Sequence, residues 1–413
     1  MLLGNRSYDL LLTGQTVSQL GNAFYPLAVY WLTFSLTHSR AELGFLGTVT
    51  SLTGIAGMFA GVYVDRWDRR WTMIWADVGR MVLTGLLAAI AAGRGLSPAV
   101  VFAFALALGL LANLFSPAQA SLLPKIVAGD DLGPAISLNQ AAGAGAGLVG
   151  TALGGMLLGL FGPALLLLLD AASFAFSWVT VGLLRLPQSA THPRPPQANA
   201  AQASRSAGYL PELREGLGYL WRHPLFRRLL PISMILNFSF MPLNVLDVVW
   251  VRQVLRLGAF AYGLFGAFTV AGVILGSVLI RPLTRRLSPW WVLSGTLLLL
   301  AGSYIAFSRL PCLVPDLGLM LCLGLAMGVA NPMVQALFQQ AVPSELMGRA
   351  TGAMSSLVLS AAPLGAMLAG LGASVAPLSV VFLVGGCLVL TTLPLAFGLA
   401  RSADKSPPQG VAG

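Results

Sequence analysis

Gly61-Val-Tyr-Val-Asp65-Arg66-Trp-Asp68-Arg69-Arg70 holds five of the chain's charged side chains, which number 24 basic and 14 acidic in all. The runs before and after it are apolar over about 20 residues, the length that crosses the hydrocarbon core of a bilayer as a helix. A short charged loop between two such runs is typical of a turn between membrane-spanning helices. This loop therefore predicts a membrane protein.

Composition supports this setting. Of the 413 residues, 56% are hydrophobic and only 9% are charged, with a mean hydropathy of +0.80, whereas a soluble domain is about 25% charged. The net charge of +10 is scattered over short loops, which is the usual pattern of membrane topology. We therefore expect membrane lipid as a partner and no nucleic acid.

Twelve apolar runs are long enough to span a membrane. They cover residues 10–35, 43–64, 71–92, 98–120, 135–160, 163–186, 226–250, 260–281, 290–309, 314–338, 350–373 and 377–400. A β-barrel would instead show alternating segments of about 10 residues. The runs predict an all-α protein, and the excess of Lys and Arg in alternate loops places both termini in the cytoplasm.

The runs divide into two halves. We expect a six-helix bundle over 1–186, a cytoplasmic linker over 187–222, a second six-helix bundle over 223–402 and a cytoplasmic tail over 403–413. The linker is rich in Pro, Ala, Gln and Ser up to residue 208. Its end, with apolar residues at Leu213, Leu217, Leu220 and Trp221, predicts an amphipathic helix along the membrane surface.

The halves also echo each other about 215 residues apart. Gly61, Arg66 and Arg70 correspond to Gly276, Arg281 and Arg285, and Gln119-Ala120 corresponds to Gln335-Ala336. Such an echo indicates a duplicated six-helix unit, giving two pseudo-symmetric bundles.

With its charged loop after the second span, this arrangement resembles the major facilitator superfamily over essentially the whole chain. Within the superfamily it resembles the bacterial macrolide-efflux and enterobactin-exporter-like branch. That resemblance rests on Gly14-Gln-Thr-Val-Ser-Gln-Leu-Gly21, Asp170-Ala-Ala-Ser-Phe174, Glu215-Gly-Leu-Gly-Tyr-Leu220 and Val342-Pro-Ser-Glu-Leu-Met-Gly-Arg349.

The resemblance implies a cytoplasmic gate at the charged loop. Asp65 would pair with an arginine or with the N-terminus of span eleven when that side is shut, and Asp68 stands where the usual pattern has glycine. The alternative is that the charges only fix topology. The expected gate residues are Gly61, Asp65, Arg66, Arg69 and Arg70, together with Asp77 and Arg80 as an ion pair on span three.

Glycines recur on one face of span five, and they resemble the antiporter motif of drug exporters, with Ala146 and Thr151 as departures from it. A general packing face of small residues is the alternative. The glycines on this face are Gly143, Gly147, Gly150 and Gly154, and Gly155 completes the motif.

Two acidic residues within spans are candidates for proton coupling. Asp170 lies in span six and Asp247 lies near the outer end of span seven, and carboxyl groups inside a membrane are costly enough to suggest a function. The alternatives are a structural hydrogen-bonding role for Asp170 and exposure to solvent for Asp247.

Polar residues along the spans are candidates for a substrate cavity. They are Asn22, Tyr25, Asn113, Gln119, Asn139, Asn237, Asn244 and Gln335.

The sequence lacks the motifs of ATP hydrolysis and of metal-dependent hydrolysis. The two lysines do not lie in a phosphate-binding Gly-Lys-Ser/Thr loop, and the three histidines form no His-Glu-x-x-His motif. We therefore expect no cofactor and no metal, and an intramembrane enzyme is a remote alternative.

The leading hypothesis is a secondary-active exporter of amphipathic drugs or macrolides, coupled to protons and working by alternating access. A dedicated siderophore exporter or lysophospholipid transporter is the alternative. We expect a monomer in the bacterial inner membrane.

Overall fold

The described part of the chain is entirely helical. The computed structural model describes residues 5–64, 67–93, 95–127, 129–184, 209–343 and 346–404, and every regular element within these ranges is a helix. The all-α class predicted from the sequence is thereby confirmed.

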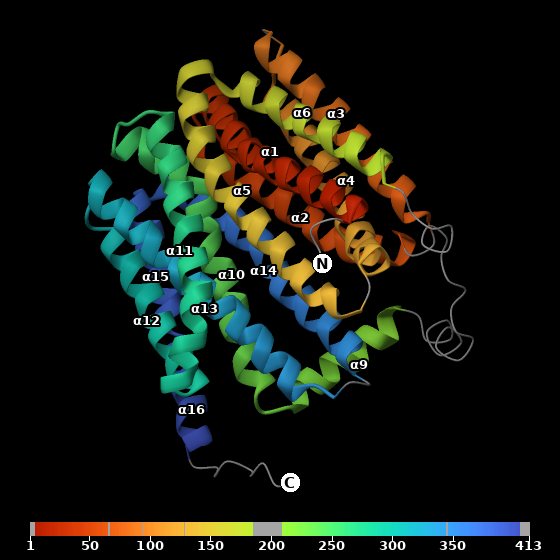
Figure 1. Ribbon diagram of the computed structural model, residues 1–413. Coiled ribbons are helices and arrows are strands. Elements are labelled where there is room, and N and C mark those ends of the chain that lie inside the picture. Colours follow the sequence, from red (N-terminus) through yellow and green to blue (C-terminus); the bar gives the residue numbers. More distant parts are fainter. Residues whose placement is uncertain are drawn as a thin grey trace. The chain divides into compact units, whose positions relative to one another are not determined.

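The first six predicted spans correspond to six long helices (Figure 1). They are α1 (Arg6–Thr37), α2 (Arg40–Val64), α3 (Arg69–Ala92), α4 (Pro98–Ile126), α5 (Leu132–Phe161) and α6 (Pro163–Gly182), with a 3₁₀ turn, η1 (Gly129–Asp131), before α5. Helix α1 packs against both α5 and α6, while α3 packs against α4 and α6, and α2 against α4.

The later described elements are also helices. They are α9 (Tyr209–Arg222), α10 (Phe226–Val249), the π-helical η2 (Trp250–Val254), α11 (Ala259–Arg286), α12 (Pro289–Phe307), α13 (Leu313–Ala341), α14 (Met347–Val375), α15 (Leu378–Leu390) and α16 (Leu393–Asp404). Among the described helical segments, ten are long and apolar enough to cross a membrane, counting α10 with η2 and α15 with α16 as one each. Helices α1 and α2 lie at the first two predicted spans.

Helix ends differ from the predicted limits because capping, rather than hydropathy, sets them. Helix α1 begins four residues before its apolar run, since the Asn5 side chain accepts hydrogen bonds from the Ser7 and Tyr8 backbone N–H groups at 3.2 and 3.3 Å. The seventh span continues through η2 to Val254, and the twelfth is interrupted between Leu390 and Leu393. Hydropathy alone carries no signal for these features.

The duplicated unit is visible in the helix limits. Helices α4 and α13 begin at Pro98 and Leu313 and end at Ile126 and Ala341, so both limits are 215 residues apart. Helices α5 and α14 begin at Leu132 and Met347, with the same separation. The offset that two short sequence echoes suggested thus extends to whole helices.

By its contacts, the chain forms two compact units. The first contains Met1–Ala201 and Asp247–Ala267, and the second contains Gln202–Leu246 and Phe268–Gly413. The end of α10, η2 and the start of α11 therefore pack with α1 to α6. The domain boundaries expected at residues 186 and 223 stay predictions.

In the second unit, α9 is fixed to the start of α14. Gly216 lies so close to the Arg349 carbonyl group that a Cβ atom would collide with it, and the Glu215 and Arg349 side chains form an ion pair at 2.7 Å. The Tyr219 hydroxyl donates a hydrogen bond to the Ala341 carbonyl oxygen at 3.1 Å. The amphipathic segment is helical, and its anchored side is formed by Gly216, Tyr219 and the buried Leu220.

Candidate functional site

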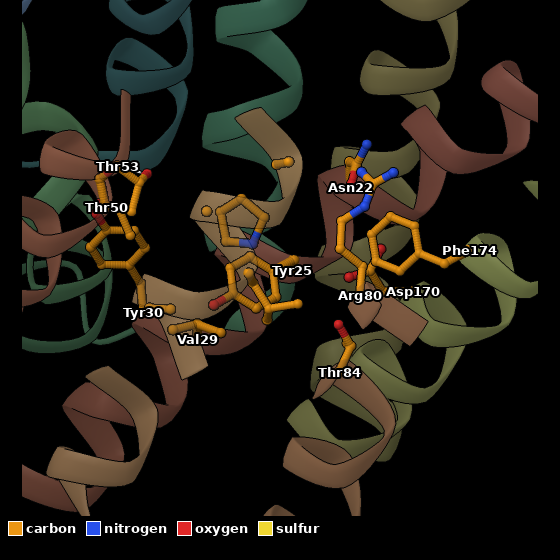
Figure 2. A pocket seen from close by; sticks show the side chains of 15 residues that line it. Asn22, Tyr25, Val29, Tyr30, Thr50, Thr53, Arg80, Thr84, Asp170 and Phe174 are labelled. Atoms are coloured by element: carbon orange, nitrogen blue, oxygen red, sulfur yellow. Dashed lines mark hydrogen bonds between the residues drawn. The ribbon is translucent and has the colours of Figure 1, made fainter. Parts of the chain in front are cut away.

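A cavity of about 290 Å³ lies within the first unit, among α1, α2, α3, α4 and α6 (Figure 2). Its wall is mainly apolar and aromatic. The lining residues are Asn22, Tyr25, Pro26, Val29, Tyr30, Thr50, Thr53, Arg80, Thr84, Ala105, Leu108, Gly109, Ala112, Asp170 and Phe174. Figure 2 shows Arg80, Asp170 and Phe174 gathered on one side and Tyr30, Thr50 and Thr53 on the other.

Three buried oxygen atoms of this wall have no hydrogen-bond partner in the described structure. They belong to the Tyr25 hydroxyl, the Thr84 hydroxyl and one carboxyl oxygen of Asp170, whose side chain is only 1% exposed. Buried polar groups are usually hydrogen-bonded, and leaving one without a partner costs about 1–3 kcal/mol. All three residues line the cavity, so a ligand or a proton there would find unsatisfied groups to bind.

The positive charge of the wall, on Arg80, has a direct partner in Asp77 and also acts on Asp170. The Arg80 guanidinium forms a buried ion pair with Asp77, three residues earlier on α3. The same group lies between two aromatic rings, 4.5 Å from the centre of Phe115 and 4.4 Å from the centre of Phe174. A planar guanidinium suits such stacking better than a lysine ammonium.

The carboxylate of Asp77 is held by further hydrogen bonds. The Ser177 hydroxyl donates to it at 2.7 Å, and the Gln15 amide donates to the Ser177 hydroxyl at 3.3 Å. This network joins α1, α3 and α6 behind the cavity. A buried ion pair with satisfied neighbours fixes geometry, so Asp77 positions Arg80 at the cavity wall.

The Asp170 carboxyl group lies within the electrostatic influence of Arg80, but one of its oxygens has no hydrogen-bond partner among the described residues. The Ser173 hydroxyl bonds the Asp170 backbone carbonyl oxygen at 2.7 Å and not the carboxyl group. The side chain fits because Gly21 of α1 lies opposite: a Cβ atom at Gly21 would lie 2.9 Å from the Asp170 carboxyl oxygen and 2.6 Å from Ser173 Cβ. The glycine lets α1 and α6 approach around the carboxyl group.

Asp247, the other candidate for proton coupling, is placed differently. It ends α10 and does not line the cavity, and its carboxyl oxygen accepts a hydrogen bond from the Val248 backbone N–H at 2.7 Å. It lies close enough to Tyr30, which does line the cavity, and to Tyr262 for its carboxylate form to act on both side chains. Asp170 therefore lines the cavity, whereas Asp247 lies outside its lining and near Tyr30.

The expected gate residues are described only in part. Asp65 and Arg66 lie outside the described residues, and Gly61 belongs to the last turn of α2. Arg69 begins α3, and the Arg70 guanidinium donates a hydrogen bond to the Gly182 carbonyl oxygen at the end of α6.

Asp68, which departs from the usual loop pattern, is the N-cap of α3. Its side chain accepts hydrogen bonds from the Arg70 and Trp71 backbone N–H groups at 2.9 and 3.1 Å. Aspartate is among the best N-cap residues, and glycine is a weaker one. The departure therefore strengthens the start of α3.

The expected cavity residues do not come together at one place. Asn22 and Tyr25 line the cavity of the first unit, whereas Asn237 and Gln335 line a separate cavity of about 300 Å³ in the second unit. Asn113 instead donates hydrogen bonds to the Thr53 and Gly109 carbonyl oxygens, both at 2.7 Å. The remaining three line neither cavity: Gln119, Asn139 and Asn244.

The glycines of span five also have different neighbours. Cβ atoms at Gly150 and Gly154 would press against α1, and one at Gly155 would press against Gly263 of α11. A Cβ atom at Gly143 would only touch Gln19 at 3.7 Å, and one at Gly147 would meet open space. Close packing therefore involves the C-terminal half of this row, from Gly150 onward.

Several lining residues were missed from the sequence, chiefly Thr84, Phe174 and Thr53. Phe174 carried a signal, because it lies four residues after Asp170 and so shares its helix face. A threonine within a span gives no sequence signal for a cavity, because its hydroxyl commonly donates a hydrogen bond to a carbonyl group of its own helix. Within the described residues, no three His, Cys, Asp or Glu side chains gather as a metal site would require.

Comparisons with known proteins agree with this architecture. The sequence model of the Major Facilitator Superfamily matches residues 11–366. The multidrug efflux pump Tap of Mycolicibacterium fortuitum is 27% identical over 397 residues, which cover 91% of each chain. Macrolide efflux protein A of Streptococcus pyogenes is 21% identical over 380 residues, covering 91% of this chain and 92% of that protein.

Among solved structures, that of the nucleoside transporter NupG superposes with a TM-score of 0.75 at 13% identity. The match covers 97% of this chain and all of NupG. At this identity it shows a shared fold.

Proposed function

Because this chain belongs to the Major Facilitator Superfamily, we propose that it exports amphipathic small molecules, of the drug or macrolide type, in exchange for protons. Family membership makes it a multi-pass membrane transporter of small molecules and not an enzyme. The substrate, the direction and the coupling ion are the proposed part.

The observation that carries the proposal is the cavity with the carboxyl group of Asp170, one oxygen of which has no hydrogen-bond partner among the described residues. Ligand cavities are mostly apolar, with a few polar groups that orient the ligand. Here aromatic and aliphatic side chains surround Asp170, Tyr25 and Thr84, whose buried oxygens have free bonding capacity. An amphipathic molecule with one basic or hydrogen-bonding group suits this wall.

Proton coupling follows from the same residue. A buried carboxylate is costly in an apolar cavity, and the nearby Arg80 is already paired with Asp77. Either a proton or a cationic group of the substrate would offset the remaining cost. The two would then compete for Asp170, which is what exchange requires. Asp77 is less suited to this role, because Arg80 and Ser177 already bind its carboxylate.

The relatives support export. Two curated relatives that align along nearly their whole lengths are described as a multidrug efflux pump and a macrolide efflux protein. At 21–27% identity they support the class of transport more than any one substrate. We further propose a monomer in the bacterial inner membrane with both termini in the cytoplasm, and a gate formed by the loop around Asp65.

Proton release by purified protein tests the assignment of Asp170. Cationic dyes and macrolides would be added to weakly buffered, detergent-solubilised protein, and binding and released protons would be measured together. We expect wild-type protein to release about one proton for each dye bound and Asp170→Asn to release none.

Asp247→Asn is the matched control, because it removes the other candidate carboxyl group for proton coupling, which does not line the cavity. It should release as many protons as wild type. Equal release by wild type and Asp170→Asn would reject Asp170 as the coupling group, whereas loss of release in Asp247→Asn alone would transfer the role to that residue.

A further inference from the structure

A long groove of about 910 Å³ lies on the second unit, outside both cavities, beside α9, α10 and α14. Its lining is mainly apolar and includes two arginines. The residues that matter here are Arg214, Leu217, Trp221, Arg222, Leu230 and Leu357. Figure 1 shows α9 beside α14, and its contacts with Arg349 place it at the start of that helix.

The attachments of α9 leave this groove open. Glu215, Gly216 and Tyr219 bind α9 to α13 and α14, so these residues hold the helix in place. Trp221 lines the groove and is 71% exposed. An exposed tryptophan beside leucines is unusual on a surface that faces only water, whereas tryptophan is common at the membrane interface.

The charge of the groove is positive. Its one carboxylate, Glu215, is already paired with Arg349 at 2.7 Å. Arg214 and Arg222 are exposed and have no acidic partner within the described residues. Two unpaired guanidinium groups in the lining suit a phosphate, which arginine binds through two parallel hydrogen bonds.

The groove also lies next to the start of a span. Helix α10, which is long and apolar enough to span the bilayer, begins at Phe226, four residues after the last residue of α9. Helix α9 is therefore held near the surface of the bilayer, where headgroup phosphates lie. Arginine side chains at such a position place their charge among headgroups while their stems cover apolar surface.

We propose that this groove binds an anionic phospholipid of the surrounding membrane. Its phosphate is held by Arg214 and Arg222, and one acyl chain lies along Leu217, Leu230 and Leu357 with Trp221 at its edge. The bound lipid covers the exposed side of α9. The helix is then held by α13 and α14 on one side and by a lipid of the bilayer on the other. This proposal is independent of the transported substrate.

Lipid titration followed by native mass spectrometry tests the proposal. Delipidated protein in detergent would receive phosphatidylglycerol or phosphatidylcholine with identical acyl chains. We expect preferential binding of phosphatidylglycerol, and about a fivefold loss of affinity for each arginine removed, or roughly 30-fold for Arg214→Gln with Arg222→Gln. Both side chains are exposed, so the fold should be unaffected.

The matched control removes the same charge from another exposed basic pair, Arg285→Gln with Arg286→Gln at the end of α11. It should leave the preference unchanged. Equal affinity for the two lipids in wild-type protein, or an equal loss in both double variants, would overturn the proposal.

Tryptophan fluorescence locates the lipid. The emission of Trp221 is obtained by subtracting the spectrum of Trp221→Phe from that of wild-type protein. Phosphatidylglycerol brominated on its acyl chains should quench this emission, and brominated phosphatidylcholine at the same concentration should quench it less. A difference signal that responds equally to both lipids, or to neither, would place the anionic lipid elsewhere.

Discussion

Two buried carboxyl groups of the first unit, Asp77 and Asp170, are in opposite situations. Asp77 is bonded by Arg80 and Ser177, whereas one oxygen of Asp170 has no partner within the described structure. The first arrangement holds a geometry, and the second leaves bonding capacity for a proton or a ligand. Both side chains are buried, so the difference between a positioning role for Asp77 and a binding role for Asp170 lies in their hydrogen-bond partners.

The Asp77–Arg80 pair should be strongly coupled in stability. Removing one charge leaves the other buried without a partner, so Arg80→Gln or Asp77→Asn alone should lower the free energy of unfolding by about 3–5 kcal/mol. The double variant should lose less than the sum by roughly 0.5–3 kcal/mol. Unfolding in detergent with increasing denaturant measures the cycle, and strictly additive losses would contradict the pairing.

Gly21 should tolerate no larger side chain. A Cβ atom there would press on Asp170 and Ser173, so Gly21→Ala should lower the free energy of unfolding by about 1–3 kcal/mol and disturb the cavity. Gly147→Ala is the control, since that position faces open space and alanine favours a helix by about 0.5–1 kcal/mol. Thermal unfolding in detergent compares them, and equal midpoints would argue against the close approach of α1 and α6.

At the scale of single elements, hydropathy predicts spans but not their ends. All twelve apolar runs are represented by helices, yet the caps at Asn5 and Asp68 and the π-helical turn after Val249 depend on local hydrogen bonds. The amphipathic helix was expected to lie on the membrane surface. Its attachment to α14 depends on the lack of a side chain at Gly216, which a hydrophobic pattern does not reveal.

Two glycines on α9 offer a direct test of that attachment. Gly216 lies against the Arg349 backbone, whereas a Cβ atom at Gly218 would have no neighbour within 4 Å. Gly216→Ala should therefore loosen α9 and speed hydrogen exchange of its backbone amides about fivefold or more, while Gly218→Ala should not. Mass spectrometry of peptides covering α9 gives the rates, and matching rates in both variants would refute the attachment.

For the whole molecule, the sequence predicted the family and its fold correctly. The charged loop, the twelve runs and the echo at 215 residues all follow from local patterns, and the family match over residues 11–366 confirms the outcome. The cavity was predicted only in part, since Tyr25, Asn22, Arg80 and Asp170 were candidates for separate reasons.

The cavity could not be predicted as a unit because it depends on how five helices pack. Nothing in the sequence shows that Phe115 and Phe174, from α4 and α6, enclose the Arg80 guanidinium. Likewise, the amide residues divide between two cavities according to the rotation of each helix. Rotation about a helix axis is weakly encoded when a span is apolar on all sides.

Transport by reconstituted protein is the decisive test of proton-coupled export through Asp170. Vesicles with an acidic interior would contain the protein, and the uptake of a cationic dye and the internal pH would be recorded together. We predict dye accumulation against its gradient with a matching rise in internal pH, both abolished by Asp170→Asn. Dye accumulation that persists when the pH gradient is collapsed, or dye movement without any proton movement, would contradict proton-coupled export.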